Sequence, residues 1–187
     1  MKILEVKSSI LGANSTSSKY AKKLIELLNG DKITVRDVAE NPVTQLSGLV
    51  LGALQNPDTA VSIEHNILIE EAKNADVMVI AAPMYNFTIP STLKNYFDAI
   101  TKAGVTFKYE ATGPVGLLKN KKAYVIISRG GKYREAGITF QEDYLKMQLS
   151  FIGITNVKFI FIEGGAMGVS PEELDESFNK QFKQLFV

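Results

Sequence analysis

At 187 residues the chain has room for one sheet covered by helices on both faces, and no room for a second catalytic domain. Its 21 basic and 20 acidic residues give a formal net charge of +1, so neither nucleic acid nor an anionic membrane is expected as a partner. The absence of cysteine excludes thiol nucleophiles and cysteine-ligated metals, so redox chemistry would require a bound cofactor. No apolar run reaches the length of a membrane span, and we expect a cytoplasmic protein.

Apolar periodicity predicts strands and helices that alternate along the chain. Strands are expected at 2–7, 32–36, 77–82, 122–128 and 157–163. Helices are expected at about 18–28, 62–74, 90–102 and 140–151, with a short one at 49–54 and a last one opened by the capping box Ser170-Pro-Glu-Glu173. This order predicts an α/β fold: one domain over 1–187 with a parallel five-stranded sheet of order 2-1-3-4-5 and helices on both faces.

The segment from Lys7 to Ser18 joins the first strand to the first helix and consists largely of small and hydroxylated residues. Unpaired N–H groups and the helix dipole make such a junction a binding site for a phosphate group. Neither the Gly-x-Gly-x-x-Gly turn nor a Walker loop is present, which leaves the flavodoxin-like solution, where hydroxyls and amides hold the phosphate of a mononucleotide such as FMN. The alternative is that Ser15 to Ser18 only cap the helix.

Two further loops follow central strands and therefore meet the first one at the carboxyl edge of the sheet. Residues 83–90 place Met84, Tyr85 and Phe87 between two prolines, a surface on which a flat ring could lie. Residues 128–134 carry an adjacent glycine pair, which lets the backbone approach a ligand closely. Apolar packing and a basic surface turn are the alternatives for these two loops.

Other ionisable residues give little indication of catalysis. His65, the only histidine, is expected on a solvated helix face, where no serine nucleophile or metal ligand set accompanies it. The charged groups of the second and third long helices are expected to be solvated: Glu70, Glu71, Lys73, Lys94 and Asp98. We therefore expect no metal and no catalytic side chain, with the chemistry residing on the cofactor.

Taken together, six segments resemble the FMN-dependent NADH-azoreductase, or NADH:quinone oxidoreductase, family of the flavodoxin-like superfamily. They are Lys7-Ser-Ser-Ile-Leu11 with Ser15-Thr-Ser17, Ala81-Ala-Pro-Met-Tyr-Asn-Phe87, Leu93-Lys-Asn-Tyr-Phe-Asp98, Ala103-Gly-Val-Thr-Phe-Lys-Tyr109 with Gly113-Pro114, Ser128-Arg-Gly-Gly131 and Phe151-Ile-Gly-Ile154. The resemblance covers nearly the whole chain.

The resemblance implies one FMN per subunit, with NADH as electron donor and quinones or azo compounds as acceptors, in ping-pong hydride transfer through flavin N5. It implies that the phosphate is bound by Ser9, Ser15, Thr16 and Ser17. It implies that the ribityl chain and ring are lined by Met84, Tyr85, Asn86 and Phe87, with the polar edge of the ring closed by Ser128, Arg129, Gly130 and Gly131. It also implies a homodimer, with a substrate pocket surrounded by Phe107, Tyr109 and Phe151.

Two questions remain open at this level. The expected cofactor-facing loop 48–58 has Gln55 and no arginine, so Arg129, Lys132 and Arg134 could hold the dinucleotide phosphates instead, and the choice between NADH and NADPH is unsettled. A flavodoxin-type electron carrier or a non-catalytic flavin-sensing module would share the same fold. The carrier is less favoured because the strong acidity usual in flavodoxins is missing.

Overall fold

The structure, a computed structural model, describes residues 1–185. Its main sheet has five parallel strands in the order β2-β1-β3-β6-β7. Their bounds are β1 (Lys2–Lys7), β2 (Lys32–Asp37), β3 (Val77–Pro83), β6 (Lys122–Arg129) and β7 (Asn156–Glu163). The order confirms the predicted doubly wound arrangement of the flavodoxin-like fold.

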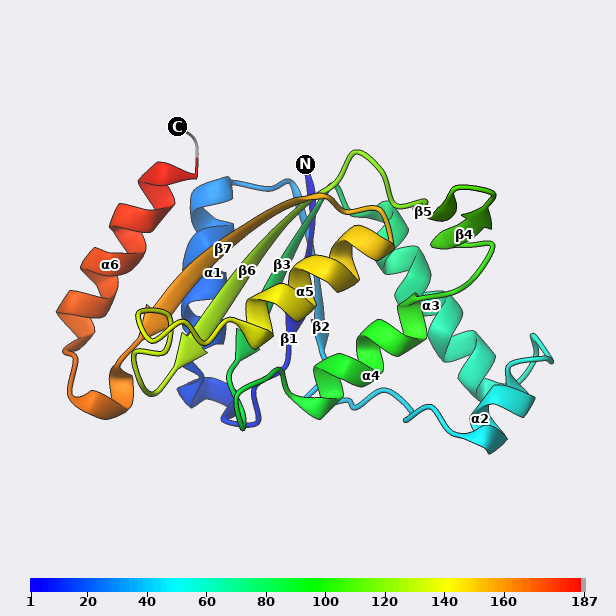
Figure 1. The fold of residues 1–187 in the computed structure, drawn as a ribbon, viewed down its shortest axis with the longest axis horizontal. Helices are drawn as coiled ribbons and strands as arrows, with labels where there is room; N and C mark the ends of the chain where they lie inside the picture. Colours follow the sequence, from blue (N-terminus) through cyan, green and yellow to red (C-terminus); the bar gives the residue numbers. More distant parts are fainter. Residues whose placement is uncertain (186–187) are drawn as a thin grey trace.

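Helices cover both faces of this sheet, as Figure 1 shows. The long helices are α1 (Thr16–Leu28), α3 (Ala60–Asn74), α4 (Ser91–Ile100), α5 (Phe140–Phe151) and α6 (Pro171–Gln184). Shorter helical segments are α2 (Gly48–Ala53) and the 3-10 turns η1 (Gly12–Asn14) and η2 (Gly165–Met167). Among residues 1–185, no helix combines the length and apolar character needed to cross a bilayer.

Two apolar cores lie on opposite faces of the sheet, because successive residues of a strand point to opposite sides. In β3, Val79 packs with α1 and α6, whereas its neighbour Ile80 packs with α3, α4 and α5. Every residue of β3 is buried, as expected for a central parallel strand covered on both faces. The sheet therefore has a rigid centre, and the loops at its carboxyl edge are anchored on both sides.

The main difference from the sequence prediction is an antiparallel hairpin of β4 (Phe107–Glu110) and β5 (Gly113–Gly116). These strands have four residues each, which is too short for alternation to be recognised. The hairpin packs closely on the end of α5, where a Cβ on Gly116 would lie 2.1 Å from the backbone nitrogen of Gly153. Glycine is required at this contact because the two backbones touch.

Two expectations about the second long helix, α3, are wrong. His65 is 5% exposed rather than solvated, because it continues the buried face formed by Ser62, Ile69 and Ala72, and this burial lowers its pKa. Glu71 is only partly exposed, because its carboxylate accepts a hydrogen bond of 3.1 Å from Nε of Arg36 on β2. Glu70, Lys73, Lys94 and Asp98 form exposed ion pairs within their own helices, as expected for solvated charges.

Candidate functional site

The hydroxyl-rich loop is fixed to the sheet and to the start of α1. Ser8 Oγ donates a hydrogen bond of 2.7 Å to the carbonyl oxygen of Ala81 on β3. Ser15 is the N-cap of α1, and its Oγ accepts from the backbone N–H of Ser18 at 3.1 Å. Helix α1 begins two residues before the predicted start, so Thr16 and Ser17 belong to its first turn.

This geometry fits a phosphate group. The N–H groups of Thr16 and Ser17 lie in the first turn, where no carbonyl four residues earlier in the helix can accept from them, and the helix dipole is positive there. Capping by Ser15 and phosphate binding are therefore compatible, since the cap uses a different amide from those left for an anion. The capping alternative describes Ser15 correctly and does not compete with the phosphate prediction.

Tyr85 links the loop after β3 directly to the phosphate loop. Its hydroxyl oxygen lies 3.2 Å from Ser9 Oγ and accepts from the backbone N–H of Ile10 at 3.1 Å. Sequence reasoning placed Tyr85 beside the ribityl chain and ring and missed this second role, because no local pattern indicates where a loop tyrosine hydroxyl points. The tyrosine brings the phosphate loop and the predicted ring loop to a common point.

The loop after β3 contains a tight reversal. Backbone hydrogen bonds between Tyr85 and Thr88 of 3.0 and 3.2 Å close it, and Asn86 and Phe87 both have positive φ, at 49° and 69°. Positive φ is uncommon for asparagine and a true outlier for phenylalanine. Such backbone strain is concentrated at ligand-binding sites and persists only where surrounding contacts, here the Tyr85–Thr88 hydrogen bonds, hold the loop in one shape.

The loop after β6 lies against the loop after β3. Met84 N donates to Ser128 O at 2.8 Å, and the ring of Phe87 meets the ring of Tyr133 edge to face at 5.9 Å. A Cβ on Gly130 would lie 3.1 Å from Cβ of Ala166 in η2, so the first glycine of the pair permits close packing of two loops. All three predicted loops are therefore neighbours at the carboxyl edge of the sheet.

A cavity of about 220 Å³ opens where these loops meet. All three predicted loops contribute to its wall, which is formed by Ser9, Leu11, Thr16, Pro83, Met84, Tyr85, Ser128, Arg129, Gly130, Ile162, Gly165, Ala166 and Leu174. Ser15 lines an adjoining hollow of about 800 Å³ on the β2 side, and Asn86 lines one of about 900 Å³ beside α4. Ser17, Phe87 and Gly131 do not contribute to these walls, and Ser17 is fully buried.

The expectation that the Arg129 side chain could hold dinucleotide phosphates is wrong. Arg129 is 3% exposed, and its guanidinium donates to Glu142 at 2.7 Å and to Glu163 at 3.2 Å. The charge is already paired inside the protein, so only the backbone of Arg129 can contribute to a cofactor site. Lys132 and Arg134 remain exposed. The partner Glu163 is 34 residues away in the sequence, and the pairing can be recognised only once the ends of β6 and β7 lie side by side.

The predicted substrate aromatics form their own cluster. Phe107 packs against Phe151 at 4.5 Å and against Tyr109 at 5.5 Å between ring centroids. This cluster lies on the β4-β5 hairpin and the end of α5, at the opposite end of the molecule from η1 and the phosphate loop (Figure 1). One chain alone does not bring these residues to the cavity, so a role at the substrate pocket depends on a second chain.

Comparison with known proteins agrees with this geometry. Residues 1–185 match the family of proteins with the flavodoxin-like fold. The FMN-dependent NADH:quinone oxidoreductases of Yersinia enterocolitica and of Escherichia coli O157:H7 are each 46% identical to the chain over 178 residues, which cover 89% of this chain and 89% of the relative. The crystal structure of an FMN-dependent NADH-azoreductase from Bacillus anthracis in complex with FMN is 27% identical, with a TM-score of 0.84 over 99% of this chain and 97% of that one. The chain therefore belongs to the family of FMN-dependent NADH:quinone oxidoreductases, within the flavodoxin-like fold.

Proposed function

We propose that this chain is an FMN-dependent NADH:quinone oxidoreductase that also reduces azo compounds, with the flavin bound across the cavity at the carboxyl edge of the sheet. The observation that carries the proposal is the meeting of three loops there, each with groups suited to a different part of the cofactor. Bound FMN would supply the hydride chemistry, taking two electrons from NADH and passing them to the acceptor in successive half-reactions. The cytoplasmic location expected from the sequence is part of this proposal.

The protein's contribution is to bind, orient and exclude water. Thr16 and Ser17 would hold the phosphate through first-turn amides, with Ser9 and Ser15 as hydroxyl neighbours. Met84 and Tyr85 would lie along the ribityl chain and ring, and the hydrogen bonds between Tyr85 and Thr88 that close the turn would fix the ring loop. Backbone groups of residues 128–131 would face the polar edge of the ring, where preorganised N–H dipoles stabilise negative charge.

We further propose that the enzyme is a homodimer whose second chain completes the acceptor pocket. Along α5, Phe140, Tyr144, Met147 and Phe151 follow one another at helical spacing, and Phe140 and Met147 are 71% and 65% exposed. An apolar helix stripe that continues to the exposed Tyr109 suits a protein interface. Contact between two such surfaces could bring the aromatic cluster of one chain toward the flavin loops of the other.

An anaerobic titration of the purified protein tests this function. The protein should be yellow with FMN near one per chain, NADH should bleach the flavin absorbance, and a benzoquinone should then restore it. Repeated turnover by the protein alone would distinguish an oxidoreductase from an electron carrier. If NADH leaves the bound flavin oxidised, the proposed activity is wrong, and the result favours a flavin-sensing module.

A further inference from the structure

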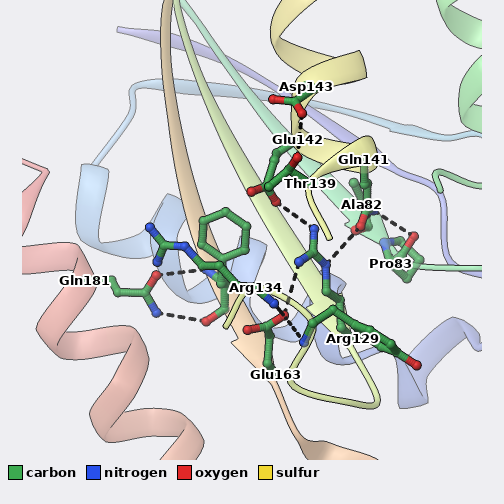
Figure 2. A network of polar contacts seen from close by, with 12 residues as sticks. Ala82, Pro83, Arg129, Arg134, Thr139, Gln141, Glu142, Asp143, Glu163 and Gln181 are labelled. Atoms are coloured by element: carbon green, nitrogen blue, oxygen red, sulfur yellow. Dashed lines mark hydrogen bonds and ion pairs between the residues drawn. The ribbon is translucent and has the colours of Figure 1, made fainter. Parts of the chain in front are cut away.

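A buried charged network lies immediately behind the flavin loops. The guanidinium of Arg129, at the end of β6, donates to Glu142 and Gln141 on the first turn of α5 and to Glu163 at the end of β7. Figure 2 shows these side chains converging on the arginine. The side chain of Arg129 is fully buried and those of Glu142 and Glu163 are about 15% exposed, so the ion pairs are largely shielded from water.

Glu163 accepts hydrogen bonds from the loop after β6 as well as from Arg129. Its Oε1 also accepts from the backbone N–H groups of Tyr133 and Arg134, at 3.1 and 3.2 Å. These two residues follow the Gly130-Gly131 pair in a loop whose residues from Arg134 to Gly137 are exposed. One carboxylate oxygen therefore fastens an exposed loop to the end of the sheet.

Gln141 carries the network to the other flavin loop. Its Oε1 lies 3.4 Å from Nε of Arg129, and its Nε2 donates to the carbonyl oxygens of Ala82 and Pro83 at 3.0 and 3.2 Å. These carbonyls directly precede Met84 and Tyr85. A continuous chain of hydrogen bonds thus runs from the loop after β3, through Gln141 and Arg129, to Glu163 and the loop after β6.

We propose that Glu163, Arg129 and Gln141 are positioning residues that hold the two ring-binding loops at a fixed spacing, so that the flavin site is formed before the cofactor binds. None of the three side chains is needed to touch the cofactor for this role. A buried network whose members are all satisfied is rigid, and a site that is already formed avoids the entropic cost of ordering its loops on binding. The inference rests on the proposed function, since it assigns these loops to FMN.

The test compares Glu163→Ala with Glu163→Gln and with a matched control, Glu71→Ala. Glutamine keeps an oxygen that can accept from Tyr133 N and Arg134 N, whereas alanine removes it. Glu71 is paired with Arg36 and has a similar exposure, but lies on α3 away from the flavin loops. Each variant is measured in two ways: by hydrogen exchange of the Tyr133 and Arg134 amides in the apoprotein, and by the Kd of the apoprotein for FMN.

We expect Glu163→Ala to speed exchange of both amides and to raise the Kd for FMN about tenfold or more, since hydrogen bonds to a charged group are lost. Glu163→Gln should restore the Kd to within about threefold of the natural protein, and Glu71→Ala should leave it within about twofold. Gln141→Met should also weaken FMN binding, and this variant decides the question if Glu163→Ala does not fold.

The proposal is wrong if Glu163→Ala binds FMN with unchanged affinity. It is also wrong if Glu71→Ala weakens FMN binding as much as Glu163→Ala does, because the effect would then come from general destabilisation of the protein. If the natural protein binds no FMN, the proposed function fails instead. The exchange measurement still decides whether Glu163 holds the loop, since it needs no cofactor.

Discussion

The side-chain amide of Gln181 on α6 pairs with the backbone of Phe161 on β7 as a neighbouring strand would. Its Nε2 donates to the carbonyl oxygen of Phe161 at 2.8 Å, and its Oε1 accepts from the N–H of Phe161 at 3.0 Å. Since β7 is an edge strand of the main sheet, these backbone groups would otherwise be open to pairing with another chain. The helix thus protects the edge at this point.

Replacing Gln181 by alanine should therefore destabilise the protein and increase its tendency to aggregate. Two hydrogen bonds to a partly buried peptide are lost, and we expect a decrease of about 1–2 kcal/mol in the free energy of unfolding. Urea unfolding and light scattering on warming would measure the two effects. Gln184→Ala, at an exposed position on the same helix, is the control and should be near neutral. Equal effects of the two changes would contradict the assignment.

Replacing Ser15 by aspartate should yield a folded protein without flavin. Aspartate is as good an N-cap as serine, so α1 keeps its first turn, but the added carboxylate repels a phosphate beside Thr16 and Ser17. Ser15→Asn, an equally good cap without the charge, should retain FMN. Flavin absorbance per chain and circular dichroism are the measurements. A yellow Ser15→Asp protein would show that the phosphate lies elsewhere.

Two substitutions of Phe87 measure the energetic cost of its left-handed backbone conformation. Phe87→Gly and Phe87→Ala both remove the ring that contacts Tyr133, but only glycine adopts the φ of 69° without strain. We expect the glycine variant to be more stable than the alanine variant by about 1 kcal/mol in urea unfolding. Equal stability of the two variants would mean that the turn relaxes and stores no strain.

The buried, ionised carboxylate of Glu5 should lower the free energy of unfolding at neutral pH. It is 7% exposed, and burial raises its pKa above the ordinary value of 4.5, with Lys7 and Lys22 opposing part of the shift. The folded state holds the Glu5 proton more tightly than the unfolded state. The destabilisation caused by the buried carboxylate is therefore absent below the ordinary pKa and develops as the pH rises through the raised pKa.

The variant Glu5→Gln should therefore raise the free energy of unfolding at about pH 8 and change it much less at about pH 4, below the ordinary pKa. Urea unfolding across this range, with the exposed Glu26→Gln as control, gives the comparison. A gain independent of pH would contradict the explanation by ionisation.

Replacing Met147 by glutamate should dissociate the proposed dimer into monomers. A charge placed in the centre of the apolar stripe on α5 would have to be buried unpaired in the interface, at a cost of several kcal/mol. Size-exclusion chromatography should show a monomer, with quinone reduction decreased by at least about tenfold. Lys146→Glu, on the neighbouring exposed position, should remain dimeric. A fully active monomer would contradict a shared acceptor pocket.

The sequence by itself determined the five strands of the main sheet, because long apolar strands and amphipathic helices have periods that can be recognised locally. Their order followed from the doubly wound arrangement that alternating strands and helices favour. It also indicated the three loops of the site, since chemistry at a doubly wound sheet lies after its central strands. The β4-β5 hairpin escaped prediction because its four-residue strands are stabilised by packing against α5 rather than by a pattern of their own.

Only the tertiary structure decided which polar side chains face inward. Arg129 looked like a loop cation available to a ligand, and Glu71 and His65 looked solvated, yet all three are wholly or largely covered. The reason is physical: the cost of burying a polar or charged group depends on partners from distant segments, as Glu163 and Gln141 are for Arg129. Residue type and local spacing cannot reveal such partners before the strands are placed side by side.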